Sequence, residues 1–218
     1  MDLTALTEAL PEIIDGLEVT IAIWLAGCLL GPILGLAIAL ARQFGPRPLE
    51  RALWAFVEVI RGTPFLVQMF LLYYGGPFIG LDLDPTPAGL LGLVVYGAAY
   101  FSEILRGGLI AVPPGHVEAA LCVGLSRGQI IRRILLPEMT LLVLPACVNM
   151  WVVLLKETAI LSIITVPEFT LAVTAFGSAN FAFTQSAAVL ALAYWALTEL
   201  TGRLGRRLEA RFDRFRLV

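Results

Sequence analysis

Long apolar runs separated by charged turns dominate the hydrophobic pattern of this chain. The clearest run covers residues 19–41, which lie between Glu18 and Arg42 and carry no charged side chain. Four further runs follow at residues 53–74, 88–105, 139–155 and 184–200. A helix needs about 20 apolar residues to cross the hydrocarbon core of a bilayer, and a helix satisfies its own backbone hydrogen bonds there. The pattern therefore predicts five transmembrane helices.

A ridge of small residues runs along the first predicted helix. Gly27, Gly31 and Gly35 recur every fourth residue, so they share one face of a helix. Small residues on one face allow a second helix to approach closely inside a membrane. We expect this ridge to be a packing surface.

The stretch from residue 159 to residue 183 is less clear. It is apolar enough to suggest a sixth span, but Pro167, Glu168, Gly177 and Asn180 interrupt it. Hydropathy alone therefore leaves five or six spans. The positions of the basic residues can decide, because Lys and Arg accumulate in cytoplasmic loops.

With five spans and an outer N-terminus, all 15 basic residues except Arg61 and Lys156 fall on the cytoplasmic side. These residues are Arg42, Arg47, Arg51, Arg106, Arg127, Arg132, Arg133, Arg203, Arg206, Arg207, Arg211, Arg214 and Arg216. The predicted outer segments carry acidic residues instead, namely Asp2, Glu8, Glu12, Asp15 and Glu18 before the first span and Asp82 and Asp84 before the third. We therefore expect the N-terminus outside, the C-terminus inside, and residues 159–183 as an outer-face or re-entrant segment.

The composition also indicates a membrane protein. The chain has 218 residues, 59% of them hydrophobic and 15% charged, with a mean hydropathy of +0.87, so a soluble core could not hold its apolar surface. We expect one membrane domain over residues 1–218 and no cleaved signal peptide. Cys28, Cys122 and Cys147 have no paired spacing, so neither a disulfide framework nor a metal site is predicted. We expect no cofactor and no nucleic-acid partner.

The predicted cytoplasmic loop at residues 113–137 is too patterned for a simple connection. Glu118-Ala119-Ala120 favours a helix and Gly124 a turn. Ser126 can cap a second helix, with Gln129 three residues later as in a capping box. We therefore expect two short helices beneath the membrane.

This loop resembles the EAA loop of the permease subunits of ABC importers. Glu118-Ala119-Ala120 is followed after three residues by Gly124, and after nine more by Ile134-x-Leu136-Pro137. The resemblance implies a type I ABC importer permease fold. It also implies a coupling helix that docks on a separate cytoplasmic ATPase, with Glu118, Ala119, Ala120 and Gly124 at the contact.

Three further segments resemble the polar amino-acid uptake branch of this family, the histidine and glutamine permeases. They are Arg61-Gly62-Thr63-Pro64, the stretch from Glu103 to Gly108, and Lys156-Glu157-Thr158. The family often has Asp where this chain has Glu157, which leaves the identity of the solute open. The expected solute is a polar amino acid or a related zwitterion.

The resemblance also implies partners and a location. We expect a dimer of the ABC ATPase, a second permease subunit that is identical or homologous, and an extracytoplasmic substrate-binding protein. The location is the inner membrane of a bacterium, crossed several times. The C-terminal arginines are interpreted as topology signals in contact with anionic lipid.

Ionisable side chains inside spans are costly and usually functional. This makes Glu58, Arg61, Glu103, Lys156 and Glu157 candidates for the substrate path. The pairs Glu58–Arg61 and Glu103–Arg106 are each spaced three residues apart, so each pair could instead neutralise itself. A zwitterion needs a cation and an acceptor, which Arg61 with Glu157 or Glu103 could supply.

Pro64 adds a backbone argument. A proline inside a helix frees the carbonyl four residues earlier, here that of Ile60, and broken helices often form substrate sites in transporters. Thr63, Gln68 and Asn149 are further, weaker path candidates.

No phosphate-binding P-loop is present, because that loop needs Gly-Lys-Ser or Gly-Lys-Thr and the only lysine, Lys156, follows Leu155. We therefore expect a non-catalytic subunit whose partner hydrolyses ATP. An ion-coupled secondary transporter or channel is the alternative, although no internal repeat supports it. A non-transporting membrane assembly factor is a second alternative.

Overall fold

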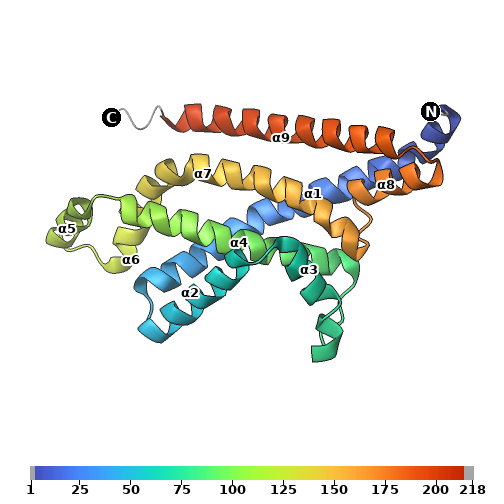
Figure 1. Ribbon diagram of the computed structural model, residues 1–218. Coiled ribbons are helices and arrows are strands. Elements are labelled where there is room, and N and C mark those ends of the chain that lie inside the picture. The colour runs from blue at the N-terminus through green and yellow to red at the C-terminus, as the bar shows by residue number, and fades with distance from the viewer. Residues whose placement is uncertain (1–2, 214–218) are drawn as a thin grey trace.

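The computed structural model describes residues 3–213, and within them every regular element is a helix (Figure 1). The longer helices are α1 (Leu3–Phe44), α2 (Arg47–Gly62), α4 (Pro85–Ala111), α7 (Leu136–Glu157), α8 (Phe169–Ala179) and α9 (Phe183–Asp213). The shorter ones are α3 (Phe65–Tyr73), η1 (Gly76–Ile79), α5 (Pro114–Cys122), α6 (Arg127–Ile130), η2 (Ile131–Leu135) and η3 (Thr158–Ile164). Asp2, Arg214 and Arg216, which entered the charge argument, lie outside the described residues.

Three helical segments of the described chain are long and apolar enough to cross a membrane. They cover Thr7–Phe44, Pro85–Ala111 and Arg127–Ile164. The bent pair α2 and α3 makes a fourth if it is counted as one span. α9 falls outside this set, because polar residues at its start, such as Gln185, and charged residues from Glu199 onward lie on either side of its apolar stretch. The all-helical class is thus confirmed, and the count of five spans stays a prediction.

The glycine ridge on α1 is a packing surface, as predicted. A Cβ added at Gly27 would lie 3.1 Å from Leu93 Cδ2, and one added at Gly35 would lie 2.7 Å from Phe101 Cβ. Gly97 of α4 in turn faces Gly31 of α1. The two backbones therefore approach closely because neither side places a side chain between them.

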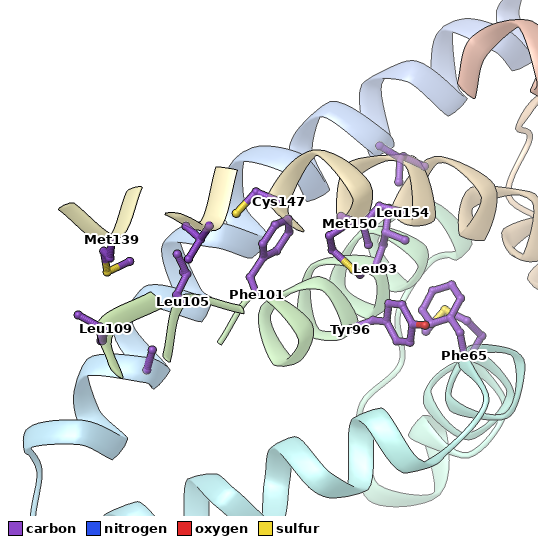
Figure 2. Close-up of a cluster of buried hydrophobic side chains, with 14 of the residues drawn as sticks. Phe65, Leu93, Tyr96, Phe101, Leu105, Leu109, Met139, Cys147, Met150 and Leu154 are labelled. Atoms are coloured by element: carbon purple, nitrogen blue, oxygen red, sulfur yellow. The ribbon is translucent and has the colours of Figure 1, made fainter. Parts of the chain in front are cut away.

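The buried core lies between α4 and α7, with α1 against both. Figure 2 shows side chains of α4, including Leu93 and Phe101, packed beside Cys147, Met150 and Leu154 of α7. Phe101 and Leu154 are fully buried. α9 runs along one side of this core and α2 and α3 lie on the other (Figure 1).

The stretch expected to form one span at residues 53–74 is two helices. α2 ends at Gly62, α3 begins at Phe65, and their axes differ by 107°. Pro64 causes the break, because Thr63 and Pro64 are both extended, with ψ of 145° and 139°, and a residue before proline avoids helical geometry. The predicted break at Pro64 is therefore confirmed, and the crossing of residues 53–74 as one bent span stays a prediction.

The ambiguous stretch after α7 contains only short elements. α7 continues into η3, and the apolar helix α8 has 11 residues, about half of what a membrane crossing needs. Thr165 and Phe181, on either side of α8, have positive φ of 62° and 52°. α8 lies beside the N-terminal part of α1, at the end of the molecule opposite α5 and α6 (Figure 1).

Candidate functional site

The EAA segment folds into the two short helices that the sequence predicts. α5 carries Glu118, Ala119 and Ala120, and α6 begins after Ser126. The Ser126 hydroxyl accepts a hydrogen bond from the Gln129 N–H, and the Gln129 side chain accepts one from the Ser126 N–H at 2.8 Å. This reciprocal capping box fixes the start of α6. Both helices project together from one end of the molecule (Figure 1).

The four expected contact residues of this loop differ in exposure. Glu118, Ala119 and Gly124 are exposed, whereas Ala120 is 3% exposed and belongs to the hydrophobic core. Gly124 has a φ of +79°, a conformation that favours glycine and ends α5. The Ala120 side chain thus packs into the core beneath α5, and the part of all four residues in an ATPase contact stays a prediction.

Two features connect this loop to α7. His116 Nδ1 on α5 lies 2.7 Å from Glu138 Oε2 in the first turn of α7. Between α6 and α7 the chain forms a π-helical turn, η2, a wide turn often found at functional sites. α5 is therefore tied to α7 both by a polar side-chain pair and through η2.

A second polar group forms where α1, α2 and α4 meet. Glu103 of α4 pairs with Arg42 of α1 and with Arg106, whose Nη2 lies 2.7 Å from Glu103 Oε2. Nη1 of Arg61 lies 4.0 Å from the same oxygen. The predicted Glu103–Arg106 pair is thus confirmed as part of a larger cluster. The alternative that Glu58 and Arg61 neutralise each other is not seen, because Glu58 is exposed and makes no ion pair within the described chain.

Two tyrosines of α4 lie between Arg61 and Glu157. The Arg61 guanidinium sits 5.5 Å from the centre of the Tyr100 ring, and the Tyr100 and Tyr96 rings are 4.7 Å apart. Glu157 is half-buried at the end of α7, on the Tyr96 side of this pair. The sequence analysis missed this arrangement, for which two tyrosines four residues apart in an apolar helix were the only signal.

The helix break brings Thr63 and Gln68 together. The Gln68 Nε2 donates to the Ile60 carbonyl at 2.7 Å and to the Thr63 carbonyl at 3.0 Å. Gln68 thus satisfies the carbonyl that Pro64 frees, and it keeps the two halves of the bent pair in contact. Because the Gln68 amide donates to backbone carbonyls, we assign Gln68 a structural role at the helix break.

The remaining candidates stay apart from this group. Asn149 is exposed and lines a cavity of about 370 Å³ between α7 and α9 together with Glu199, Arg206 and Glu209. Lys156 is exposed in the last turn of α7. The structure therefore brings Arg61, Glu103 and Glu157 near the tyrosine pair, and it leaves Asn149 and Lys156 separate.

Glu168 is a functional candidate that the sequence reading treated only as an interruption. Its side chain is fully buried before α8, and its oxygens accept hydrogen bonds from the Thr170 and Leu171 N–H groups at 2.8 Å. The hydroxyls of Thr20 on α1 and Tyr194 on α9 each lie 3.4 Å from Oε2. Burial raises the pKa of Glu168, and the backbone donors partly oppose that shift. Glu168 thus links α1, α8 and α9.

Comparisons with known proteins cover nearly the whole chain. Residues 31–214 match the family model of the binding-protein-dependent transport system inner membrane component. The glutamine transport system permease protein GlnP of Escherichia coli is 34% identical over 96% of this chain and 97% of its own length. The arginine transport system permease protein ArtQ of Bacillus subtilis is 30% identical over 96% of each chain.

Solved structures give the same fold. A crystal structure of an amino acid ABC transporter with histidines superposes with a TM-score of 0.87 at 31% identity, covering 97% of this chain and 99% of the other. The inward-facing MetNI methionine ABC transporter superposes with a TM-score of 0.72 at 18% identity, over 97% and 99% of the two chains, which is a likeness of fold alone.

Proposed function

The chain belongs to the family of binding-protein-dependent transport system inner membrane components, and from this premise we propose that it carries a polar amino acid or related zwitterion across the inner membrane of a bacterium. Members of this family are non-catalytic permease subunits of ABC importers. The observation that carries the proposal is the exposed EAA helix α5, held at the end of the molecule opposite α8 (Figure 1).

We propose that a cytoplasmic ATPase dimer docks on α5. Glu118 and Ala119 offer an exposed polar and small face, and the neighbouring Leu121 and Val123 are 54% and 76% exposed. Apolar side chains that stay exposed beside a motif of this kind suit a protein interface. The His116–Glu138 pair and η2 would then carry the motion of α5 into α7, which holds Glu157 at its far end.

The proposed orientation places α5 and α6 in the cytoplasm and α8 on the outer face. α1 begins at the α8 end and α9 runs toward the α5 end (Figure 1), which fits an outer N-terminus, an inner C-terminus and five crossings. The outer end is then available to an extracytoplasmic substrate-binding protein. A second permease subunit, identical or homologous, is expected to complete the path, because five helices seldom enclose one.

Within the chain we propose that the solute passes the group formed by Arg61, Tyr100, Tyr96 and Glu157. Arg61 supplies a cation for a carboxylate, and Glu157 supplies an acceptor for an ammonium group. Glu103 is a weaker acceptor because Arg42 and Arg106 already occupy both of its oxygens. The two tyrosine faces between these charges can also hold a cationic group.

Co-purification tests the importer assignment. The chain is expressed with its neighbouring genes, and the amount of P-loop ATPase recovered per permease is measured for wild type, Glu118→Lys and Glu12→Lys. Glu12 is an exposed carboxylate near the opposite end and matches the charge change. Wild type and Glu12→Lys should recover equal ATPase, and Glu118→Lys about tenfold less, the size of a lost interface hot spot.

Reconstituted vesicles decide between the two transport classes. Uptake of L-glutamine and L-arginine, each presented on the cognate binding protein, should require ATP and should fall for Glu157→Gln while ATPase recovery stays unchanged. Uptake driven by an ion gradient without ATP would reject the importer in favour of an ion-coupled transporter.

A further inference from the structure

Three arginines surround a single carboxylate between α1, α2 and α4. Arg42, Arg61 and Arg106 each reach Glu103, the first two from other helices. In the described part of the chain no other carboxylate lies within ion-pair distance of these guanidinium groups. The group therefore carries three positive charges and one negative charge.

Two of these arginines approach the same carboxylate oxygen and are partly exposed. Arg61 and Arg106 converge on Oε2 of Glu103, at 4.0 and 2.7 Å, and their side chains are 37% and 34% exposed. A guanidinium has five N–H donors in a flat fork, and one shared carboxylate oxygen cannot occupy the donors of both. Both guanidinium groups therefore keep N–H donors that this carboxylate does not occupy.

The third arginine is held inside. The Arg42 side chain is 7% exposed, and its buried Nε has no hydrogen-bond partner among the described residues. An unpaired buried donor on a charged group is costly, and such a group in a native protein often marks an ion or water that the protein binds. On the other side of the cluster, the Arg61 guanidinium lies 5.5 Å from the centre of the Tyr100 ring.

We propose that this cluster is a binding site for one oxyanion, a carboxylate or a phosphate, with Glu103 as the internal anion that orients the three forks. Arginine forks recognise such groups through paired, charge-assisted hydrogen bonds. A surplus of positive charge among membrane-spanning helices is unfavourable until an anion balances it. The phosphate of an anionic lipid and the carboxylate of a transported solute share this chemistry. Arg61 and Glu103 are also path candidates, but binding is measured on the permease alone and can fail while the importer function stands.

The test measures phosphate binding to the full-length chain in nanodiscs of phosphatidylcholine. The thermal unfolding midpoint is followed against inorganic phosphate, with chloride at equal ionic strength as reference, because a ligand of the folded state raises this midpoint. Four proteins are compared, namely wild type, Arg61→Gln, Glu103→Gln and Arg203→Gln. Arg203 is an exposed arginine paired with Glu199 on α9 and serves as the matched control.

The two cluster variants should change binding in opposite directions. Loss of the Arg61 fork should raise the phosphate concentration for half-saturation about tenfold, since charge-assisted hydrogen bonds are lost. Glu103→Gln should lower it severalfold, because the competing negative charge is gone while the side-chain shape is kept. Arg203→Gln should match wild type.

A purely structural cluster gives a different result. Phosphate would then shift wild type and Arg61→Gln equally, or Glu103→Gln would bind no better than wild type, and either outcome overturns the proposal. Arg61→Lys keeps the charge without the fork and should fall between wild type and Arg61→Gln, so it replaces the latter if that variant does not fold.

Two further arms identify the natural source of the oxyanion. If phosphatidylglycerol in the nanodisc abolishes the phosphate effect, the lipid headgroup occupies the site. If L-glutamine competes with phosphate while its α-amide does not, the solute carboxylate occupies it. Each result supports the proposed site and names its ligand.

Discussion

Glu103 and Glu168 are two carboxylates in the same helical protein, held by opposite means. Glu103 is surrounded by three guanidinium groups. Glu168 is fully buried with no cationic partner among the described residues, and its partners are backbone N–H groups and hydroxyls. The first arrangement leaves charge available for a further ligand, whereas the second uses all its partners inside the protein. The contrast indicates a binding site at Glu103 and a structural junction at Glu168.

Removal of the Glu103 carboxylate should have the largest effect on stability. Glu103→Ala leaves Arg42 buried without a counter-ion, and breaking a buried pair on one side costs about 3–5 kcal/mol. Chemical unfolding in a fixed membrane mimetic measures the loss. If the variant is as stable as wild type in the absence of added phosphate, Glu103 does not hold the three arginines, and the contrast with Glu168 is wrong.

Loss of the Glu168 carboxylate should lower the free energy of unfolding somewhat less than loss of Glu103, because no charged partner is left buried. Glu168→Ala removes the N-cap of α8 and strands the donors that it served, an expected loss of about 2–3 kcal/mol. The same unfolding measurement applies, with Glu18→Ala as control, because Glu18 is an exposed carboxylate on α1. Equal stability of the two variants would show that Glu168 is no junction.

Thr20 tests whether the junction reaches α1. Its hydroxyl accepts a hydrogen bond from the Phe169 N–H at 3.0 Å and donates to the Gly16 carbonyl at 3.1 Å. Thr20→Val keeps the shape and leaves the buried Phe169 N–H unpaired, so we expect a loss of about 1–2 kcal/mol. Hydrogen exchange at the start of α8 should increase in the same variant, and unchanged exchange there would contradict the link.

Tyr194 should give the smallest effect. Its hydroxyl lies 2.9 Å from Thr170 Oγ1 and 3.4 Å from Glu168 Oε2, and Glu168 keeps its two backbone donors without it. Tyr194→Phe should therefore cost less than about 1 kcal/mol by chemical unfolding. A loss as large as that of Glu168→Ala would mean that α9, and not the cap of α8, holds this junction together.

Local patterns in the sequence predicted the parts of the fold that neighbouring residues decide. The α1 ridge, the capping box at Ser126 and the break at Pro64 each depend on spacings within one helix or turn, and each is present. The composition likewise predicted an all-helical chain, and the EAA spacing predicted the family to which it belongs.

The two carboxylate networks could not be predicted in this way. Arg42 is 61 positions from Glu103, and Thr20 is 148 positions from Glu168, so neither contact leaves a periodic signal. The question whether Arg61 pairs with Glu58 stayed open for the same reason, because Arg61 lies near Glu103 on another helix and not near its neighbour on α2. Tyr96 and Tyr100 look like ordinary core residues until Arg61 and Glu157 are placed beside them.

The π-helical turn η2 has a consequence for how this loop tolerates change in length. Each residue of an α-helix turns the chain by about 100°, so one residue more or fewer between α6 and α7 rotates every later side chain by that amount. The wide turn at Ile131–Leu135 accommodates such an extra residue while the chain stays helical from α6 into α7. Deletion of a single residue here would leave α5 and α7 each intact. It would nevertheless turn Glu138 away from His116, so that the polar contact between the two helices is lost.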